Sequence, residues 1–101
     1  YKKKFLILAD MLELGDEDEK YHKEIGNLIN EKKIDYVFTY GRLANFISLE
    51  AAQKLGFDHS KNFSDKPEMI KVITELIGPN DIVLVKGSRG MNMEDVVNGL
   101  L

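Results

Sequence analysis

The chain has 101 residues and a net charge of −3, which fits one globular domain and argues against a general binder of nucleic acids or anionic membranes. It has no cysteine, which excludes disulfides and thiolate metal sites and suits a reducing cytoplasm. No apolar run approaches the roughly 20 residues that a membrane-spanning helix needs. Because a strand is predicted almost directly after Tyr1, we expect the chain to be a piece of a longer protein.

The first third of the chain predicts one strand and one helix. The apolar run 5–9 predicts a buried strand, and Asp10 lies at its carboxyl end. Asp16 and Glu19 have the spacing of a capping box, which predicts a helix N-terminus there. The helix is predicted over 17–33, because apolar residues recur at helical spacing at Tyr21, Ile25, Leu28 and Ile29.

The middle of the chain repeats this order. Aromatic and β-branched residues over 34–40 predict a second strand, which Gly41-Arg42 ends. Apolar spacing predicts a second helix over 43–55, with Gly56 as its C-cap. The pattern beyond it is ambiguous, and a short edge strand near 62–63 is one interpretation.

The last third predicts a helix, a strand and a final helix. Asp65 and Glu68 again have capping-box spacing, and an apolar stripe runs from there to the stop signal Gly78-Pro79. Four apolar residues, 82–85, predict a fully buried strand. Asn92 is then predicted to cap a last helix, whose apolar residues are Met93, Val96, Val97, Leu100 and Leu101.

This alternation of strands and helices predicts the fold class. It is typical of an α/β protein with a Rossmann-like three-layer sandwich, in which helices cover both faces of a mostly parallel sheet. Ligands of such sheets bind at the carboxyl ends of the strands. The chain has only two arginines, Arg42 and Arg89, and each lies within a few residues after a predicted strand, as Asp10 does.

The candidate site therefore lies at this edge of the sheet. Its residues are predicted to be Asp10, Arg42, Lys86, Gly87, Ser88 and Arg89. The guanidinium and ammonium groups suit a carboxylate or phosphate, aided by a helix N-terminus just beyond the last strand. Asp10 suits an amine, so the set fits a zwitterionic ligand. The alternative is that 86–90 is a solvated basic turn.

Other sites are not indicated. His22 and His59 have no partner at metal-ligand spacing, and we expect structural or solvent-facing roles for both. The chain has neither the G-x-G-x-x-G fingerprint nor the Walker A motif, which argues against a dinucleotide or ATP site in this domain alone.

Three stretches of the sequence resemble the C-terminal domain of the Mur ligases. They are Ala9-Asp10-Met11-Leu12-Glu13-Leu14-Gly15, His22-x-x-x-Gly26, and Asp81-x-Val83-Leu84-Val85-Lys86-Gly87-Ser88-Arg89-Gly90-Met91-x-Met93-Glu94. They span nearly the whole chain in the family's order. Ala9 departs from the pattern, which has glycine there, and we expect only local consequences. The resemblance is greatest to members that join D-alanyl-D-alanine to UDP-N-acetylmuramoyl-tripeptide.

The resemblance implies a cytoplasmic, ATP-dependent, amide-forming ligase of peptidoglycan precursor synthesis. Such enzymes have three domains, and the central one binds ATP and Mg²⁺ and activates the tripeptide carboxyl as an acyl phosphate. The third domain, which this chain resembles, closes over the site and positions the incoming amino acid or dipeptide. The partners implied are the two substrates and the missing N-terminal and central domains, with no nucleic acid and no membrane insertion.

For the residues of this chain, the resemblance implies substrate binding rather than catalysis. The turn from Lys86 to Arg89 would contact D-alanyl-D-alanine, with Arg89 suited to its carboxylate. Arg42 lies where relatives have an arginine-bearing substrate turn, and Asp10 would support the loops. No catalytic residue, metal or cofactor is expected in this chain, which lacks the domain's opening strand segment and is expected to be inactive alone.

Two alternatives come from other functional classes. A phosphoacceptor signalling domain would use a strand-end aspartate and lysine such as Asp10 and Lys86, but the further acidic pair of such domains is absent. A non-enzymatic interaction domain with this common fold is the other alternative, since one fold hosts many functions.

Overall fold

The computed structural model describes residues 3–12, 15–30 and 33–101 of the chain. Residues 1–2, 13–14 and 31–32 lie outside this description, and so do the parts of the predicted features that fall on them: the start at Tyr1, Glu13-Leu14 of the first resemblance motif, and residues 31–32 of the first predicted helix. Within the described ranges the order of elements is strand, helix, strand, helix, strand, helix, strand, helix.

A four-stranded sheet forms the middle layer. Its strands are β1 (Lys4–Ala9), β2 (Tyr36–Tyr40), β3 (Ser60–Phe63) and β4 (Ile82–Lys86). They lie in the order β3-β2-β1-β4, and every pair is parallel. The parallel arrangement places all carboxyl ends of the strands at one edge, as predicted.

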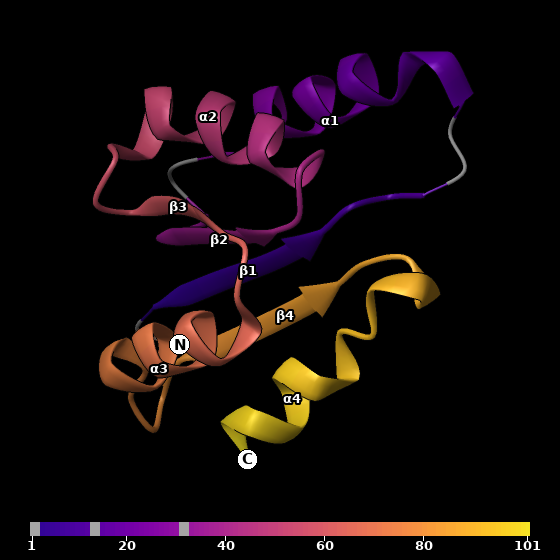
Figure 1. Cartoon of the computed structure of the whole chain (residues 1–101). Helices are drawn as coiled ribbons and strands as arrows, with labels where there is room; N and C mark the ends of the chain where they lie inside the picture. The colour runs from indigo at the N-terminus through magenta and orange to yellow at the C-terminus, as the bar shows by residue number, and fades with distance from the viewer. Residues whose placement is uncertain (1–2, 13–14, 31–32) are drawn as a thin grey trace.

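Helices cover both faces of this sheet (Figure 1). One layer consists of α1 (Asp18–Asn27) and α2 (Ala44–Leu55), and the other of α3 (Lys66–Leu76) and α4 (Glu94–Leu100). Two short 3₁₀ helices, η1 (Gly15–Glu17) and η2 (Arg89–Met91), precede α1 and α4. The right-handed crossover rule explains the layers, because the chain moves one way across the sheet from β1 to β3 and returns from β3 to β4. The predicted Rossmann-like three-layer fold is confirmed.

Side chains of the sheet pack into two separate cores, because successive residues of a strand point to opposite faces of the sheet. On the α3 and α4 side, Phe5 and Ile7 of β1 pack with Phe38, Met69 and Val96, and all five are at most 2% exposed. The core on the α1 and α2 side is smaller, and its buried members are Ile29, Val37, Ala44, Ile47 and Ala51.

The prediction of a fully buried last strand is wrong. β4 lies at the edge of the sheet, and α2 packs over β2 and β3 rather than over β4. Val83 and Val85 therefore pack into the larger core, whereas Ile82 is 40% and Leu84 is 56% exposed. Alternating burial is what a strand covered on one face shows.

Helix α1 differs most from its prediction. It starts at Asp18 after η1, and its N-cap residue, Glu17, makes no side-chain capping bond, so the capping box predicted for Asp16 and Glu19 does not form. The helix ends at Asn27, short of residue 33. Its buried residues are His22 and Gly26, whereas Tyr21 and Leu28 are exposed.

Gly26 explains this choice of face. A Cβ atom at Gly26 would lie 2.8 Å from the carbonyl oxygen of Ile47, so α1 and α2 approach each other through a position without a side chain. His22 lies one turn earlier on the same face. The His22-x-x-x-Gly26 pattern thus has a structural reason that apolar periodicity does not reveal.

Most other boundaries are close to the predicted ones. Gly56 is the C-cap of α2 with a φ of 91°, and the short edge strand near 62–63 is confirmed as β3. Asp65 occupies the N-cap of α3, although its side chain makes no capping bond. Asn92 does not cap the last helix: it has a left-handed backbone and ends η2, and Met93 is the N-cap residue of α4. None of the helices within the described ranges has the length and apolar character to cross a membrane.

Candidate functional site

The six predicted site residues meet at the carboxyl edge of the sheet. Ala9 pairs with Tyr40 on one side, and Leu8 pairs with Lys86 on the other. Asp10 therefore follows β1, which lies between β2 and β4. Arg42 follows β2, and the turn 86–89 follows β4. Strand order, which cannot be read from the sequence, is what makes these three strand ends neighbours.

Asp10 is buried and supports the turn that carries Arg42. Its carboxylate oxygen Oδ1 accepts a hydrogen bond of 2.6 Å from the backbone N–H of Ala44, at the start of α2. Gly41, between β2 and α2, has a φ of 113°, and a Cβ atom there would overlap the carboxylate. The acid therefore fills the space beside a glycine turn and satisfies an N–H group that a helix start leaves free. This geometry fits loop support, as the resemblance implies.

Ser88 ties the loops after β1 and β4 together. Its backbone N–H donates to the carbonyl of Asp10 over 3.3 Å, and its Oγ accepts a bond of 2.7 Å from the N–H of Leu12. Gly87 packs directly on the end of β1, because a Cβ atom there would lie 2.8 Å from the Cβ of Ala9. The backbone of the turn is therefore fixed against β1, and a side chain at Gly87 would push it away.

The three cations of the site remain open to a ligand. The side chains of Arg42, Lys86 and Arg89 are exposed. Among the described residues the ion pairs are Lys3–Asp81, Lys23–Glu19 and Lys66–Asp95, and none involves a site cation. The helix N-terminus expected just beyond the last strand does not follow the turn directly, because η2 lies between β4 and α4, which begins at Glu94. Recognition of an anion here would therefore depend on the side-chain charges rather than on a helix dipole.

A pocket of about 420 Å³ opens beside the turn. Its lining residues come from β1, from α1 and α2 and from the turn itself, and are Leu8, Ala9, Met11, Ile25, Ile47, Lys86, Gly87 and Ser88. The pocket is therefore mainly apolar and lies on the α1 and α2 side, next to the uncovered face of β4.

The two histidines have the structural and solvent-facing roles expected. His22 is fully buried, its Nε2 accepts a bond of 3.0 Å from the N–H of Met11, and its Nδ1 lies 2.7 Å from the carbonyl of Asp18. These partners require a neutral ring with its proton on Nδ1. His59 is exposed and stacks on Tyr36. Across the ranges the structure describes, no group of three or more His, Asp or Glu residues could hold a metal ion.

Lys66 is a residue of this edge that sequence reasoning missed. Its ammonium donates to the carbonyl of Asn92 over 3.0 Å, pairs with Asp95 at 3.3 Å and lies 5.3 Å from the centre of the Tyr40 ring. The sequence signal was ambiguous, because a lysine after a capping aspartate reads as a solvated helix residue.

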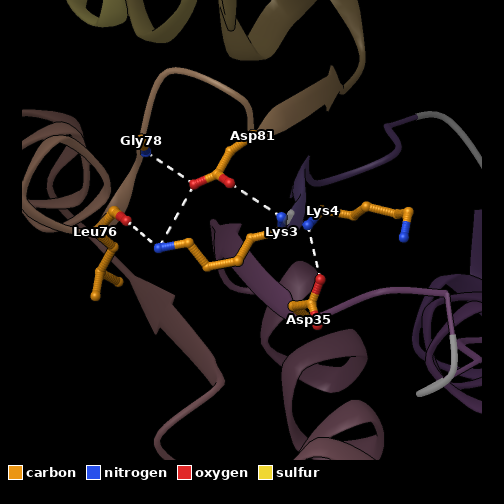
Figure 2. Close-up of polar contacts among 6 residues, drawn as sticks. All are labelled: Lys3, Lys4, Asp35, Leu76, Gly78 and Asp81. Carbon is orange, nitrogen blue, oxygen red and sulfur yellow. Dashed lines mark hydrogen bonds and ion pairs between the residues drawn. The ribbon is translucent and has the colours of Figure 1, made fainter. Parts of the chain in front are cut away.

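The opposite edge of the sheet holds a different kind of polar cluster, which Figure 2 shows. The carboxylate of Asp81 accepts bonds of 3.0 Å from the N–H of Lys3 and 2.8 Å from that of Gly78, and it pairs with the ammonium of Lys3 at 3.5 Å. Desolvation acts to raise the pKa of Asp81, but these hydrogen bonds and the charge of Lys3 outweigh it and lower the pKa below 3.8. Asp35 likewise accepts from the N–H of Lys4 at 2.8 Å.

Comparisons with known proteins identify close relatives. Residues 1–89 match the family model "Mur ligase, glutamate ligase domain". The whole chain is 43% identical to a stretch of the UDP-N-acetylmuramoyl-tripeptide–D-alanyl-D-alanine ligase of Bacillus subtilis, and spans 22% of that protein's length. The ligase of the same name from Escherichia coli is 36% identical over 94% of the chain, which spans 20% of that protein.

Solved structures show the same fold. A crystal structure of MurF from Acinetobacter baumannii superposes with a TM-score of 0.81 at 27% identity, over 97% of this chain and 22% of that one. MurF ligase from Thermotoga maritima, solved in complex with ADP, matches with a TM-score of 0.72 at 24% identity, over 97% of this chain and 21% of that one. The latter likeness shows the fold alone.

Proposed function

Since the chain belongs to the Mur ligase family, we propose that it is the C-terminal, substrate-positioning domain of an ATP-dependent ligase that joins D-alanyl-D-alanine to UDP-N-acetylmuramoyl-tripeptide in peptidoglycan precursor synthesis. The observation that carries this proposal is 43% identity over the full chain to a ligase of that name. A non-enzymatic or signalling role has no comparable support.

In this proposal the carboxyl edge binds the dipeptide. Arg89 is exposed and unpaired among the described residues, so its guanidinium is free to hold the carboxylate of D-alanyl-D-alanine with two parallel hydrogen bonds. Lys86 and Arg42 add positive charge on either side. Gly87 and Ser88 shape the turn, and Asp10 supports the loop of Arg42.

Held in this way, the dipeptide would present its amine to the activated carboxyl group of the tripeptide. Orientation turns a bimolecular attack into one between bound groups, which is the contribution we assign to this chain. Closure of the domain over the site would also exclude water from the activated carboxyl. We assign it no general base. ATP and Mg²⁺ are assigned to the rest of the enzyme, which we place in the cytoplasm.

The remaining domains are the proposed partners of this chain, and the edge strand β4 is where a further element could pack. β4 pairs only with β1 among the described strands, and Ile82 and Leu84 expose an apolar face beside the pocket. A strand preceding β1 could pair with the free edge of β4. The right-handed crossover rule would then place its helix on the α1 and α2 side, over this exposed face. We therefore propose that the domain's opening strand and helix precede residue 1 in the full-length enzyme.

The variant Leu84→Lys tests this arrangement. In the 101-residue chain the side chain is 56% exposed, so we expect a change in unfolding free energy within about 0.5 kcal/mol. In the full-length enzyme the unfolding free energy should fall by about 2 kcal/mol or more, because the lysine charge would then be buried. Equal, small effects in both proteins would show that nothing covers the face.

The binding role is tested by Arg89→Ala in the full-length enzyme. We expect the KM for D-alanyl-D-alanine to rise roughly 10- to 100-fold, as for loss of a charged hydrogen-bonding pair. The KM for the UDP-linked tripeptide should stay within about twofold, because the lost contact is to the other substrate. Lys71→Ala is the matched control, since it removes an exposed cation of α3 away from this edge. An unchanged KM for the dipeptide would refute the assignment.

A further inference from the structure

Lys66 joins three elements at the carboxyl edge of the sheet. Its side chain is only 17% exposed, although lysine side chains are usually solvated. The ammonium contacts the carbonyl of Asn92, the carboxylate of Asp95 and the face of the Tyr40 ring. α3, the end of β2 and the start of α4 are therefore linked through one side chain.

Helix α3 itself gives no reason for a cation at this position. Lys66 is the first residue of α3, and positive charge in the first turn of a helix opposes the helix dipole. The same end of the helix favours an acid, which Glu68 provides. The contacts that favour Lys66 are instead those to residues 92 and 95, in the segment that follows the Arg89 turn.

Asn92 is a strained point of that segment. It has φ and ψ of 50° each and is the one non-glycine residue with a positive φ in the part of the chain that the structure describes. A left-handed backbone is unfavourable for residues with a Cβ atom, and Asn tolerates it better than most. The N–H of Asn92 donates to the carbonyl of Arg89 over 3.2 Å, which closes the η2 turn.

The segment 88–92, which contains Arg89, is thus held at both ends. Ser88 fixes its start to Asp10 and Leu12, and Lys66 donates to the carbonyl of Asn92 at its end. Between these anchors the side chain of Arg89 extends into solvent. A binding group on a fixed backbone loses less conformational freedom when it engages its ligand.

We propose that Lys66 is a positioning residue, which sets the direction of Arg89 by holding the left-handed Asn92 at the end of the segment 88–92. The inference rests on the proposed role of Arg89 in binding the dipeptide carboxylate. Lys66 does not touch the substrate, because its ammonium is already engaged by Asn92 and Asp95.

The test uses the full-length ligase and the variant Lys66→Met, whose unbranched side chain is one atom shorter than that of lysine and has neither the charge nor the hydrogen-bond donors. The KM for D-alanyl-D-alanine should rise about tenfold, with kcat within about twofold, because the loss affects binding and not the chemical step. Lys66→Arg should restore most of the affinity, since a guanidinium can donate to both acceptors. Lys71→Met on the exposed side of α3 is the matched control and should change neither constant.

Asp95→Asn separates the two contacts. It removes the ion pair but leaves the carbonyl of Asn92 in place, so it should change the KM less than Lys66→Met does. Amide hydrogen exchange of residues 88–92 in the full-length enzyme gives a readout besides activity. Exchange should accelerate in Lys66→Met and not in Lys71→Met. If Lys66→Met does not fold, Lys66→Gln, which removes the charge but keeps a polar side chain, should show the same two changes.

Failure of this inference is distinguishable from failure of the proposed function. If Arg89→Ala raises the KM for the dipeptide while Lys66→Met leaves both KM and exchange unchanged, the positioning role is wrong and the binding site stands. If Arg89→Ala has no effect on KM, the binding site itself is wrong. An equal loss of activity in Lys66→Met and Lys66→Arg, carried by kcat alone, would also overturn the positioning role.

Discussion

The two edges of the sheet use charge in opposite ways. At the amino edge, Asp81 and Asp35 accept backbone N–H groups of neighbouring segments, and the ammonium of Lys3 bonds the carbonyl of Leu76 at 2.6 Å (Figure 2). At the carboxyl edge, the buried acid Asp10 and the hydroxyl of Ser88 also serve the backbone. Lys66 pairs with Asp95 there, but Arg42, Lys86 and Arg89 have no ion-pair partner among the described residues.

This difference indicates that the polar groups of the amino edge contribute to stability, and it supports the proposal that the carboxyl edge binds a ligand. Charged groups whose hydrogen bonds are all made within the fold stabilise it and are not available to bind a partner. Fixed loops that carry unpaired cations contribute little stability and leave their binding capacity free. The carboxyl edge combines the two features that a binding site needs, which are a fixed loop backbone and cations without an ion-pair partner.

The largest effect is expected from Gly41→Ala, which changes the fixed turn between β2 and α2 at the carboxyl edge. We expect a loss of about 3 to 5 kcal/mol in unfolding free energy, because the added methyl group is strained at φ 113° and overlaps the Asp10 carboxylate. Gly56→Ala is the control, since its φ is 91° but nothing lies within 4 Å of the added atom. It should cost about 1 to 3 kcal/mol from strain alone. Denaturant unfolding measures both, and equal losses would show that contact with Asp10 is unimportant.

A smaller effect, with a defined pH dependence, is expected from Asp81→Asn at the amino edge. The variant loses the charge and turns an amide N–H₂ toward one of two backbone donors, so it should be less stable at pH 7. Because folding lowers the pKa of Asp81, its contribution is present above 3.8 and is lost as the pH falls through the folded pKa. The stability difference between the two proteins should therefore shrink in acid.

Urea unfolding at a series of pH values measures this difference. Asp58→Asn serves as the control, because Asp58 is exposed and has no hydrogen bond or ion pair within the described ranges. A gap between Asp81→Asn and the unmodified protein that stays constant or widens below pH 3.8 would contradict the role of the lowered pKa.

The smallest effect on stability is expected from Arg42→Ala. Its guanidinium is exposed and has no ion-pair partner in the described parts of the chain, so the unfolding free energy should change by less than about 0.5 kcal/mol. In the full-length ligase, the KM for D-alanyl-D-alanine should rise, though less than in Arg89→Ala. A large loss of stability would mean that the Arg42 guanidinium makes stabilising contacts within the domain, as the charged groups of the amino edge do.

Local signals in the sequence predicted much of this fold. The apolar run before Asp10 became β1, and Gly56 ended α2. The stop at Gly78-Pro79 lies just beyond α3. In each case the deciding interaction is between residues close in the chain. The parallel order of strands and helices then placed Asp10, Arg42 and the turn 86–89 at one edge, which needed no knowledge of which strands are neighbours.

Other predictions failed where distant contacts decide. The apolar run of β4 does not reveal that the strand lies at an edge, and the spacing of Tyr21 and Leu28 does not reveal that Gly26 must face α2. The capping-box pairs were matched by spacing, but neither forms a capping bond. At α1 the N-cap residue is Glu17 rather than Asp16. At α3 Asp65 has the extended backbone of an N-cap residue, yet its side chain makes no capping bond.

The sequence by itself determined the alternating elements, the common edge of the site residues and the family to which they belong, because these follow from local chain geometry and from motifs that the residues carry directly. Only the tertiary structure decided that Asp10 is buried beside the Arg42 loop, that Lys66 donates to the carbonyl of Asn92, and that Arg42, Lys86 and Arg89 have no ion-pair partner among the described residues. The physical reason is that pairing and burial depend on which segments meet across the sheet, and the order β3-β2-β1-β4 is set by long-range packing.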